Sequence, residues 1–407
     1  METNGMVSAP GAAPRFHERH AMRPVVGILC EYDPFHLGHQ RQFELIRARL
    51  PGAAILCLMS GCFTQRGMPA LHTPASRAEA ALRAGADLVL ELPCAFSVRD
   101  AEGFALGGVS ILDRLGFVSH LSFGAEDDAL ALAPAAALLE HPDAAFEDAI
   151  RVGLRSGLSL AAARGRALSA RMPECAALFS KPNNILALCY LRALLRLPSL
   201  LKPLSVRRAG AYHASVLEPD GYPSATAVRA AFLSGNPDAA SAACGYALPV
   251  FPVCPPSALD RVLLFKLRST PPGALARLPQ CSEGLENRLF ACSRAAVTRE
   301  QLLSALKTKR YAHSRLNRLC CHALLGMTDR LLIDHPLPEY VRLLGFRKRS
   351  ADLLSALRKS RIPVVSKAAD FDLSDPLYRL DLRAYDLWAL GAGVPAGLML
   401  RQRIVVL

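Results

Sequence analysis

The first half of the chain alternates short apolar runs with segments of helical spacing, and this alternation limits the possible folds most strongly. Four apolar runs of strand length precede residue 125, and helical patterns separate them. Strands that alternate with helices in this way pair in parallel, with helices on both faces of the sheet. We therefore predict an α/β fold built on a parallel sheet. The predicted strands are VVGILCEY (25–32), AAILCLMS (53–60), DLVLELP (87–93) and VSHLSFG (118–124), with a fifth in LKPLSVRR (201–208).

Beyond about residue 236 the alternation ends and helical patterns dominate. SALDRVLLFKLRS, REQLLSALKTKR, SRLNRLCCHALLG and SADLLSALRKSR have helical spacing and are separated by proline and glycine. We therefore expect a flexible leader over 1–23, an α/β domain over 24–235 and a mainly helical domain over 236–407. The ordered pattern begins directly after Met22, so Met1 and Met22 are both candidates for the true start.

The excess of positive charge is concentrated in the last of these three parts. The formal net charge is +13; residues 24–235 contain 20 Lys and Arg against 19 Asp and Glu, whereas residues 236–407 contain 25 against 14. The resulting net charge of +11 is typical of domains that bind a polyanion such as RNA. A solvated basic surface without a partner is the alternative interpretation.

Two features of the whole chain bear on its location. No apolar run reaches the length of a membrane span, and the first 23 residues lack the apolar centre of a signal peptide. The 12 cysteines are scattered and form no C-x-x-C pair, which is typical of reduced thiols rather than of a disulfide framework or a zinc site. We therefore expect a cytoplasmic protein without a membrane partner or a structural metal.

The segment PFHLGH, residues 34–39, follows the first predicted strand and opens the first predicted helix. Two histidines on the first turn of a helix share one face, and the unpaired N–H groups and the dipole there favour an anion. His36 and His39 are therefore candidate donors to a phosphate group on which negative charge develops. Gly38 lets the backbone approach that ligand closely. Two histidines that only cap a helix are the structural alternative.

The segment SATAVR, residues 224–229, supplies a second phosphate-binding pattern. Ser224 and Thr226 place hydroxyls at a predicted helix start, and Arg229 follows about one turn later. Alone, such a string is usually only a helix cap. With HLGH about 190 residues upstream, it resembles the second signature of the HxGH nucleotidyltransferase superfamily, whose members attack the α-phosphate of ATP and release pyrophosphate. A GxxxxGK phosphate loop is absent from the sequence, which argues against P-loop chemistry.

Further motifs narrow the resemblance to one family. Seven segments occur in this order: VVGILCEYDPFHLGH, MSGCFTQRGMPA, GADLVLELPCAFSVRDAEGFA, LSFGAED, KPNNILALCYLRAL, RRAGAYH and SATAVR. Their combination resembles the bacterial tRNA(Met) cytidine acetate ligase family over residues 24–235, and more thinly over the basic helices beyond. The resemblance implies a nucleotidyltransferase-like Rossmannoid sheet and an enzyme that activates acetate with ATP as acetyl-adenylate. It also implies that the acetyl group passes to the exocyclic amine of the wobble cytidine of elongator tRNA(Met), forming 4-acetylcytidine.

The same resemblance implies an ATP-binding loop and three isolated ATP-binding residues. The loop comprises Leu29, Cys30, Glu31, Tyr32, Asp33, Pro34, Phe35, His36, Leu37, Gly38, His39, Gln40, Arg41 and Gln42. The isolated residues are Gly124, Asn183 and Arg208, with Asn184 and Arg207 as adjacent candidates because one sequence does not fix the register. Within this set we assign His36 and His39 to the α-phosphate as catalytic residues. The distal phosphates are assigned to Ser224, Thr226 and Arg229.

The sequence departs from the family pattern at one position of the loop. The usual EYNPFH reads EYDPFH, so Asp33 replaces an amide. A carboxylate beside a triphosphate needs a positive charge to offset repulsion, and we expect it from Mg²⁺, Arg41 or Arg66. The proton acceptor for the cytidine amine is not assigned, and the sequence does not separate acetate from other small carboxylates.

The segment KTKRYAHSRLNRLCCH carries the candidate contacts to tRNA. In a helix Arg315 and Arg318 share a face, and Tyr311 is a candidate for stacking on a base. Several basic runs in one domain favour phosphate binding over a solvated helix face. Two other functions stay open: a small-molecule adenylyltransferase, which leaves the basic part without a purpose, and a non-catalytic tRNA-binding protein. The candidate tRNA contacts are Lys307, Lys309, Arg310, Arg315 and Arg318.

Overall fold

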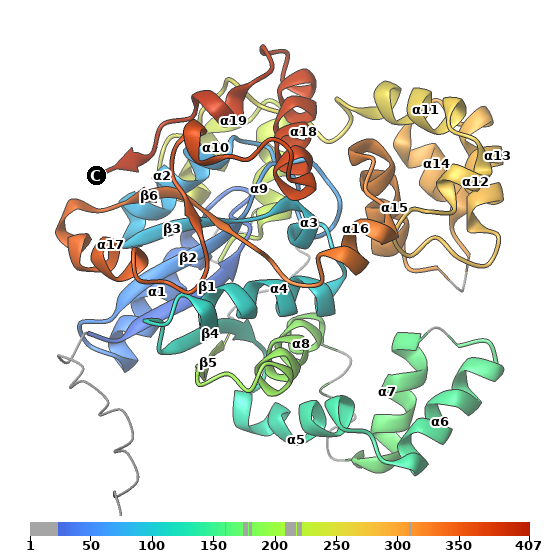
Figure 1. Cartoon of the computed structure of the whole chain (residues 1–407), viewed down its shortest axis with the longest axis horizontal. Coiled ribbons are helices and arrows are strands. Elements are labelled where there is room, and N and C mark those ends of the chain that lie inside the picture. Colours follow the sequence, from blue (N-terminus) through green and yellow to red (C-terminus); the bar gives the residue numbers. More distant parts are fainter. Residues whose placement is uncertain are drawn as a thin grey trace, which may run out of the picture.

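The computed structural model describes residues 23–158, 160–173, 178, 181–207, 217, 222–308 and 311–407. Its centre is an eight-stranded sheet in the order β5-β4-β1-β2-β3-β6-β7, with β8 beside β6 (Figure 1). Five strands are parallel to one another and coincide with the predicted runs, which confirms the predicted α/β class. They are β1 Val25–Cys30, β2 Ala54–Ser60, β3 Leu88–Leu92, β4 His120–Ala125 and β5 Lys202–Arg207.

Side chains of the central strands alternate between two apolar cores, one on each face of the sheet. On one face Val26 packs with Phe43 and Ile46 of α1 and with residues of α2. On the other face Leu56 and Leu58 pack with residues of α4. Because successive side chains of a strand point to opposite faces, fully apolar strands need helices on both sides. The helices that cover these faces include α1 Leu37–Arg49, α2 Pro74–Ala84, α3 Cys94–Ser97 and α4 Ala101–Arg114.

Capping side chains fix where α2 and α4 begin. Thr73 accepts a hydrogen bond from the Ser76 N–H at 3.2 Å, and Asp100 accepts one from the Gly103 N–H at 2.9 Å. Pro74 occupies the first turn of α2, where its missing N–H costs nothing. The loops that lead into these helices leave the carboxyl ends of parallel strands, so they gather along one edge of the sheet.

One group of helices follows β4 and packs beside α4. Its members are α5 Ala129–Glu140, α6 Ala144–Arg155, α7 Leu160–Arg171 and α8 Pro182–Arg196. Within this group Arg192 of α8 is buried and pairs with Glu102 of α4 at 2.8 Å and with Glu140 of α5 at 3.1 Å. These ion pairs hold α8 against the helices on both sides of it, and α8 in turn leads the chain into β5.

Beyond β5 the chain forms a helical pair and then a second group of helices. The pair, α9 Ala225–Leu233 and α10 Pro237–Cys244, shares a small core that contains Val228, Ala240 and Leu248. The second group lies at one end of the molecule (Figure 1). It comprises α11 Asp260–Ser269, α12 Pro272–Leu275, α13 Leu285–Ala295, α14 Arg299–Leu306, α15 His313–Leu325 and α16 Asp329–Asp334.

The last 70 residues or so return to the sheet, which the sequence did not predict. Strand β6 pairs antiparallel with β3, and β7 and β8 pair with β6. The expectation of a mainly helical part over 236–407 therefore omits three strands, because the antiparallel partner of β6 lies about 250 residues upstream. The elements are β6 Val341–Phe346, α17 Ala351–Leu357, β7 Val364–Val365, α18 Pro376–Gly391, α19 Leu398–Arg401 and β8 Val405–Val406, with short 3₁₀ turns at Lys348–Ser350 and Ala368–Asp370.

A buried polar network joins this C-terminal segment to the parallel part of the sheet. Arg342 of β6 donates to the Glu91 carboxylate of β3 at 2.9 Å and to the Tyr385 hydroxyl of α18 at 2.7 Å. Asp381 of α18 accepts hydrogen bonds from the Tyr340 hydroxyl at 2.5 Å and from the N–H that begins α3 at 2.7 Å. Since an unpaired buried charge is very costly, each group requires its partner in the other segment.

The structure bears on two expectations from the sequence, one about membrane spans and one about the cysteines. No helix in the part of the chain that the structure describes is both long and apolar enough to cross a membrane. The described cysteines all carry free thiols, and each is buried except Cys292, which is half-buried. Burial removes these thiols from the solvent and raises the pKa of several of them, for example that of Cys281 to about 11.

Candidate active site

The predicted histidine pair lies where β1 passes into α1. His36 is the N-cap of α1: its Nδ1 accepts a hydrogen bond from the Gly38 N–H at 3.1 Å, and its own N–H donates to Nδ1 of His39 at 3.2 Å. The two rings stack with their centroids 3.7 Å apart. Because each Nδ1 accepts a backbone N–H, each neutral ring carries its hydrogen on Nε2. Each ring therefore carries a donor hydrogen on Nε2 close to the positive end of a helix, with His36 1% exposed and His39 half-buried.

Aromatic side chains fix the orientation of these rings. Tyr32, Phe35 and Phe43 are buried in the core beneath α1. The His39 ring lies 4.8 Å from the Tyr32 ring and 5.5 Å from the Phe35 ring, measured between centroids. Tyr32 has a φ of 47°, in the left-handed region that non-glycine residues rarely adopt. Such strain is frequent where the surrounding structure holds a functional loop in place.

The structure brings the second predicted motif into contact with the first. Arg229 of α9 donates to the Asp33 carbonyl at 2.5 Å and approaches the Asp33 carboxylate at 3.4 Å. A Cβ placed on Gly38 would lie 3.0 Å from the His36 ring and 3.6 Å from the Pro223 carbonyl oxygen. Gly38 is therefore the point of close approach between the loop, the histidine ring and the start of α9, which explains the need for glycine.

The hydroxyls of the second motif also have local roles. Ser224 is the N-cap of α9, and its Oγ accepts the Ala227 N–H at 3.0 Å. Thr226 accepts a hydrogen bond from the Arg229 guanidinium at 3.3 Å. The helix-cap interpretation is therefore correct for Ser224, and a contact with the distal phosphates stays a prediction for all three residues.

The charge on Asp33 is offset differently from what we expected. Its carboxylate accepts the Leu71 N–H at 2.7 Å and faces Arg229. Arg41, one of the expected partners, instead pairs with Glu44 on the exposed side of α1 at 3.0 Å, so that expectation is wrong. Arg66 lowers the pKa of Glu31, the other carboxyl group of the loop after β1. The aspartate is thus held by α9, an element that the sequence did not connect with it.

A buried arginine that the sequence analysis missed organises the loops around the site. Arg77 of α2 is 1% exposed and donates to the carbonyl oxygens of Glu31, Gly61 and His72. These three carbonyls belong to the loops after β1 and β2 and to the start of α2. A guanidinium can bridge several acceptors because it has five donors in a fixed plane. The only sequence feature that pointed to Arg77 is its position among the small apolar residues of α2.

The loop after β2 connects the site to the rest of the molecule. The Gln65 N–H donates to the Glu31 carboxylate at 2.5 Å, and the Gln65 side chain donates to the Arg99 carbonyl at 3.0 Å. Burial raises the pKa of Glu31, with the Gln65 N–H and Arg66 acting in the opposite direction. The Glu31 carboxyl is therefore a partly desolvated group at the edge of the proposed phosphate site.

The remaining predicted ATP-binding residues lie around the same edge of the sheet, and one lies outside the described residues. Gln42 donates to the Ser122 hydroxyl of β4 at 3.3 Å, and Gly124 is the residue before the end of that strand, paired with Val206 of β5. Arg207 ends β5, whereas Arg208 lies outside the described residues. Leu29 and Cys30 end β1 at this edge, and Leu37 and Gln40 lie in the first turn of α1.

The two candidate asparagines serve a common structural role. Asn183 donates to the Glu126 carboxylate at 2.7 Å. Asn184 is fully buried; its Oδ1 accepts the N–H groups of Glu126 and Asp127. Both therefore tie the start of α8 to the loop after β4. This arrangement positions the loop that follows Gly124, and it leaves the ATP contact of Asn183 as a prediction.

Comparison with known proteins identifies the family. The HIGH Nucleotidyl Transferase family matches residues 23–396. A relative from Clostridium perfringens, named tRNA(Met) cytidine acetate ligase, is 32% identical over 381 residues, which cover 90% of this chain and 94% of the relative. The chain belongs to the tRNA(Met) cytidine acetate ligase family. A tRNA(Met) cytidine acetate ligase from Syntrophomonas wolfei is 34% identical over 396 residues, with the same two coverages.

Solved structures of this family agree with the fold over nearly the whole chain. TmcAL from Thermotoga maritima in its apo form superposes with a TM-score of 0.87 and 27% identity, over 94% of this chain and 99% of that one. The same protein bound with alpha-thio ATP superposes with a TM-score of 0.84 and 26% identity. These comparisons confirm the family, the nucleotidyltransferase class and the fold that we predicted.

The predicted tRNA contacts of this ligase-family chain fit the structure poorly. Arg318 is 7% exposed, and burial lowers its pKa. Tyr311 is also 7% exposed, beneath the Arg315 guanidinium at 5.1 Å, so it does not offer a face to a base. Arg315 donates to the Gln280 carbonyl at 2.7 Å, and Lys307 donates to the Tyr311 carbonyl at 2.7 Å. Lys309 and Arg310 lie outside the described residues.

The reason for this difference is that α15 is buried over most of its surface. Nine of its 13 residues are buried, among them Arg318. Periodicity in the sequence shows which side of a helix is apolar, but it does not show that a second packing partner covers the basic side. In this case the loop after β2 does so, because a Cβ on Gly67 would lie 2.8 Å from the Arg318 backbone.

The metal expected beside ATP stays a prediction. Within the described ranges, no three or more His, Cys, Asp or Glu side chains are grouped so that they could hold a metal ion. Magnesium usually binds through substrate phosphates together with one or two carboxylates. The two carboxylates in the loop before the histidines, Glu31 and Asp33, are already hydrogen-bonded to backbone N–H groups. The residues present therefore suit a Mg²⁺ ion carried by the nucleotide better than a preformed protein cage.

Proposed function

We propose that this protein activates acetate with ATP and transfers the acetyl group to the exocyclic amine of the wobble cytidine of elongator tRNA(Met), forming 4-acetylcytidine. The observation that carries the proposal is the stacked His36–His39 pair with Arg229 close by, in a chain that belongs to the tRNA(Met) cytidine acetate ligase family. The TmcAL complex with an ATP analogue supports ATP as the activating substrate.

In the first step a carboxylate oxygen of acetate attacks the α-phosphorus of ATP. The new bond joins that oxygen to phosphorus, and the bond between the α-phosphorus and the bridging oxygen breaks, which releases pyrophosphate. The Nε2–H groups of His36 and His39 and the N-terminus of α1 donate to the α-phosphate oxygens as negative charge develops. We assign the distal phosphates to Arg229 together with Ser224 and Thr226, which lie at the start of α9.

In the second step the amine of cytidine attacks the carbonyl carbon of acetyl-adenylate. The carbon–oxygen bond to AMP breaks, AMP leaves, and the amine loses one proton. Acetate itself would have to expel oxide, whereas acetyl-adenylate expels a stable phosphate monoester. Catalysis then depends mainly on holding the amine and the carbonyl in contact, so no covalent nucleophile of the protein is required. Mg²⁺, if it enters on the phosphates of ATP, neutralises part of their charge.

Labelled acetate tests the proposal directly. The purified protein, ATP and unmodified elongator tRNA(Met) should give labelled RNA, and omission of ATP should abolish the label. Acetyl-coenzyme A should not replace ATP and acetate. Labelling that needs acetyl-coenzyme A but not ATP would contradict the proposal, and adenylate formation on a small molecule without any RNA labelling would favour a small-molecule adenylyltransferase. A cytoplasmic location, expected from the sequence, suits all three substrates of the proposed reaction: ATP, acetate and tRNA.

A further inference from the structure

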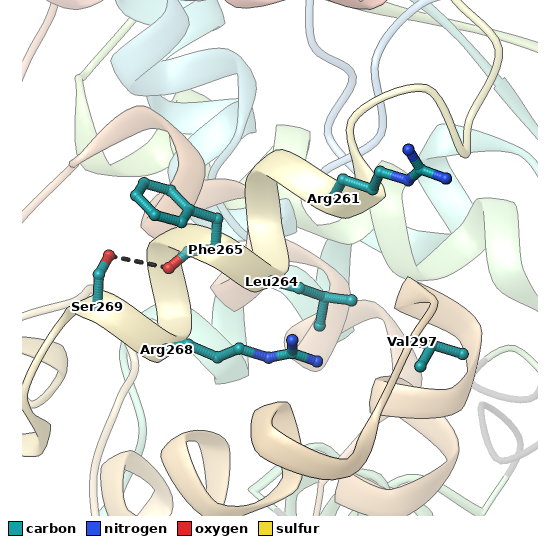
Figure 2. A pocket seen from close by; sticks show the side chains of 6 residues that line it. All are labelled: Arg261, Leu264, Phe265, Arg268, Ser269 and Val297. Carbon is teal, nitrogen blue, oxygen red and sulfur yellow. Dashed lines mark hydrogen bonds between the residues drawn. The ribbon is translucent and has the colours of Figure 1, made fainter.

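The second group of helices carries a surface hollow on α11 that the active site does not use (Figure 2). Its volume is about 400 Å³. Five of its lining residues come from α11, and the sixth lies in the connection between α13 and α14. The residues drawn in Figure 2 are Arg261, Leu264, Phe265, Arg268, Ser269 and Val297.

An aromatic side chain stands exposed at this hollow. Phe265 is 72% exposed, although α11 buries Leu263, Leu264 and Leu267 in the core of the helical group. Phe265 therefore adds little to the packing of its own helix. Val297, on the other side of the hollow, is 66% exposed. An apolar patch that is rimmed by polar groups is typical of a surface that binds a partner.

The charges around this aromatic residue are positive. Arg261 lies one turn before Phe265 on the same side of α11 and makes no hydrogen bond or ion pair with any residue that the structure describes. The neighbouring acid, Asp260, is directed away: its carboxylate accepts the Arg299 N–H at the start of α14 at 3.0 Å. Arg268 donates to the Ser293 and Ala296 carbonyls, so it closes the wall of the hollow and keeps its charge there.

The second group of helices as a whole also has an excess of positive charge. Residues 260–334 contain 13 Lys and Arg against 6 Asp and Glu. A surface of this kind attracts a polyanion and repels a second copy of itself. On α15, Arg318 is buried and Arg315 is bound to the Gln280 carbonyl, whereas Arg261 on α11 is exposed.

We propose that Phe265 is a platform on which an unpaired base of the RNA stacks, and that Arg261 binds a phosphate next to that base. The inference rests on the proposed function, because it takes tRNA as the substrate. Every base has a flat π face that stacks on an aromatic ring, and proteins commonly recognise single-stranded RNA in this way. Arginine beside the ring supplies the charge that the phosphate requires.

Two alanine variants and one control test the platform. The variants are Phe265→Ala and Arg261→Ala, and the control is Phe251→Ala. Phe251 is 65% exposed, close to the value for Phe265, but no charged residue occurs between 246 and 259. The measurement is the dissociation constant for elongator tRNA(Met) at several salt concentrations.

The two variants should differ in kind. Phe265→Ala should weaken RNA binding by about 5- to 100-fold and leave the slope of log affinity against log salt unchanged. Arg261→Ala should weaken binding and make that slope shallower by about one. Phe251→Ala should bind like the unaltered protein. A merely structural role of Phe265 would not separate affinity from salt dependence in this way.

A tryptophan at the same position reports on stacking. Phe265→Trp should keep the affinity, and its fluorescence should be quenched when RNA is added. The one tryptophan of the natural chain, Trp388, is fully buried, so it contributes a constant background. Phe251→Trp should show no quenching under the same conditions.

Two outcomes would overturn the platform, and a third would contradict the proposed function alone. Equal affinities for Phe265→Ala and Phe251→Ala, with no quenching of the tryptophan at 265, would overturn the platform. Sedimentation that shows a dimer without RNA, lost in Phe265→Ala, would instead assign the surface to self-association and also overturn it. Acetate-dependent ATP–pyrophosphate exchange without RNA should be equal in all these variants. Its absence from the unaltered protein would contradict the proposed function while leaving the RNA measurements valid.

Discussion

At the scale of single residues, the histidines of the candidate site cap a helix, and the proposed mechanism also uses them to bind phosphate. His36 and His39 each use Nδ1 to hold the start of α1, which fixes the hydrogen on Nε2 and its direction. Arg77 is buried beneath the site and donates hydrogen bonds to carbonyl oxygens of the loops that carry it. These roles separate by substitution, because capping needs an acceptor at one ring position and phosphate binding needs a donor at the other.

Replacing His39 by asparagine should remove catalysis with little change in stability. The asparagine carboxamide can still accept the His36 N–H that Nδ1 of His39 accepts at 3.2 Å, but it has no group at the position of Nε2. Acetate-dependent ATP–pyrophosphate exchange should fall by about 10²- to 10³-fold, as for the loss of one donor to a developing charge. Calorimetry should place the unfolding temperature within about 2 °C of the natural protein. His141→Asn, at the exposed end of α5, is the control. Unchanged exchange would remove His39 from the mechanism.

Replacing Arg77 by methionine should destabilise the protein and reduce exchange together. The substitution leaves three buried carbonyl oxygens without the donors that Arg77 supplies. We expect a loss of at least about 2 kcal/mol in the free energy of unfolding. Arg83→Met on the same helix is a matched control, because Arg83 has a 64% exposed side chain and pairs with Glu79. That change should cost no more than about 0.5 kcal/mol. Equal urea midpoints for the two variants would refute the role of Arg77.

At the scale of elements, the decisive contact is the packing of α18 and β6 on β3 and α3. The polar groups in this contact are buried, and burial changes the pKa of the ionisable ones. Burial, and secondarily the charge of Glu91, raises the pKa of Asp381 to about 7. The Tyr340 hydroxyl, the N–H that begins α3 and Arg342 act in the opposite direction.

The raised pKa of Asp381 predicts that stability falls with rising pH. In the unfolded chain an aspartate titrates near pH 3.9, whereas in the folded protein the pKa of Asp381 is about 7. The folded state therefore holds this proton more tightly, and the stabilisation is complete below about pH 4 and lost as the pH rises through about 7. Asp381→Asn keeps the acceptor for the Cys94 N–H and cannot ionise. Relative to this variant, urea unfolding of the natural protein should lose on the order of 1 kcal/mol per pH unit between about pH 5 and 7. A constant difference across that range would contradict the pKa shift.

At the scale of the whole molecule, the end of the chain completes the sheet that carries the site. Strand β6 covers the edge of β3, and Arg342 neutralises Glu91 in the interior. The loops of the candidate site and the last strands of the chain are therefore built on one sheet. The boundary near residue 236 remains a prediction about function, since the strands beyond it belong to the sheet.

A fragment that ends at residue 235 should consequently fail to fold cooperatively. It exposes the edge of β3 and leaves the Glu91 carboxylate buried without Arg342, which costs several kcal/mol. Circular dichroism melting and limited proteolysis should show a broad transition and rapid cleavage. The control is a chain that starts at Met22, which retains every described residue and should melt like the full protein. A sharp transition of the fragment at the temperature of the full chain would show that residues 24–235 are an independent domain.

The sequence by itself determined the features that depend on local pattern. Apolar runs and helical spacing located five parallel strands, and HLGH after the first of them located the histidine pair at the start of α1. The motifs also led to the family. These predictions succeed because periodicity reports burial directly, and because a helix start has the same unpaired N–H groups in any protein.

Only the tertiary structure decided which distant groups meet. The pairing of Glu91 with Arg342 spans 251 positions, and the contact of Arg229 with Asp33 spans 196. Likewise, α15 buries Arg318 and Tyr311 beneath other elements, while α11 leaves Phe265 exposed, although both helices look amphipathic in sequence. A helical pattern specifies one apolar face, but packing determines how much of the remaining surface is covered. The positive charge in the sequence therefore predicted a surface for RNA in this part of the chain, and the fold determined which of its basic and aromatic side chains are exposed.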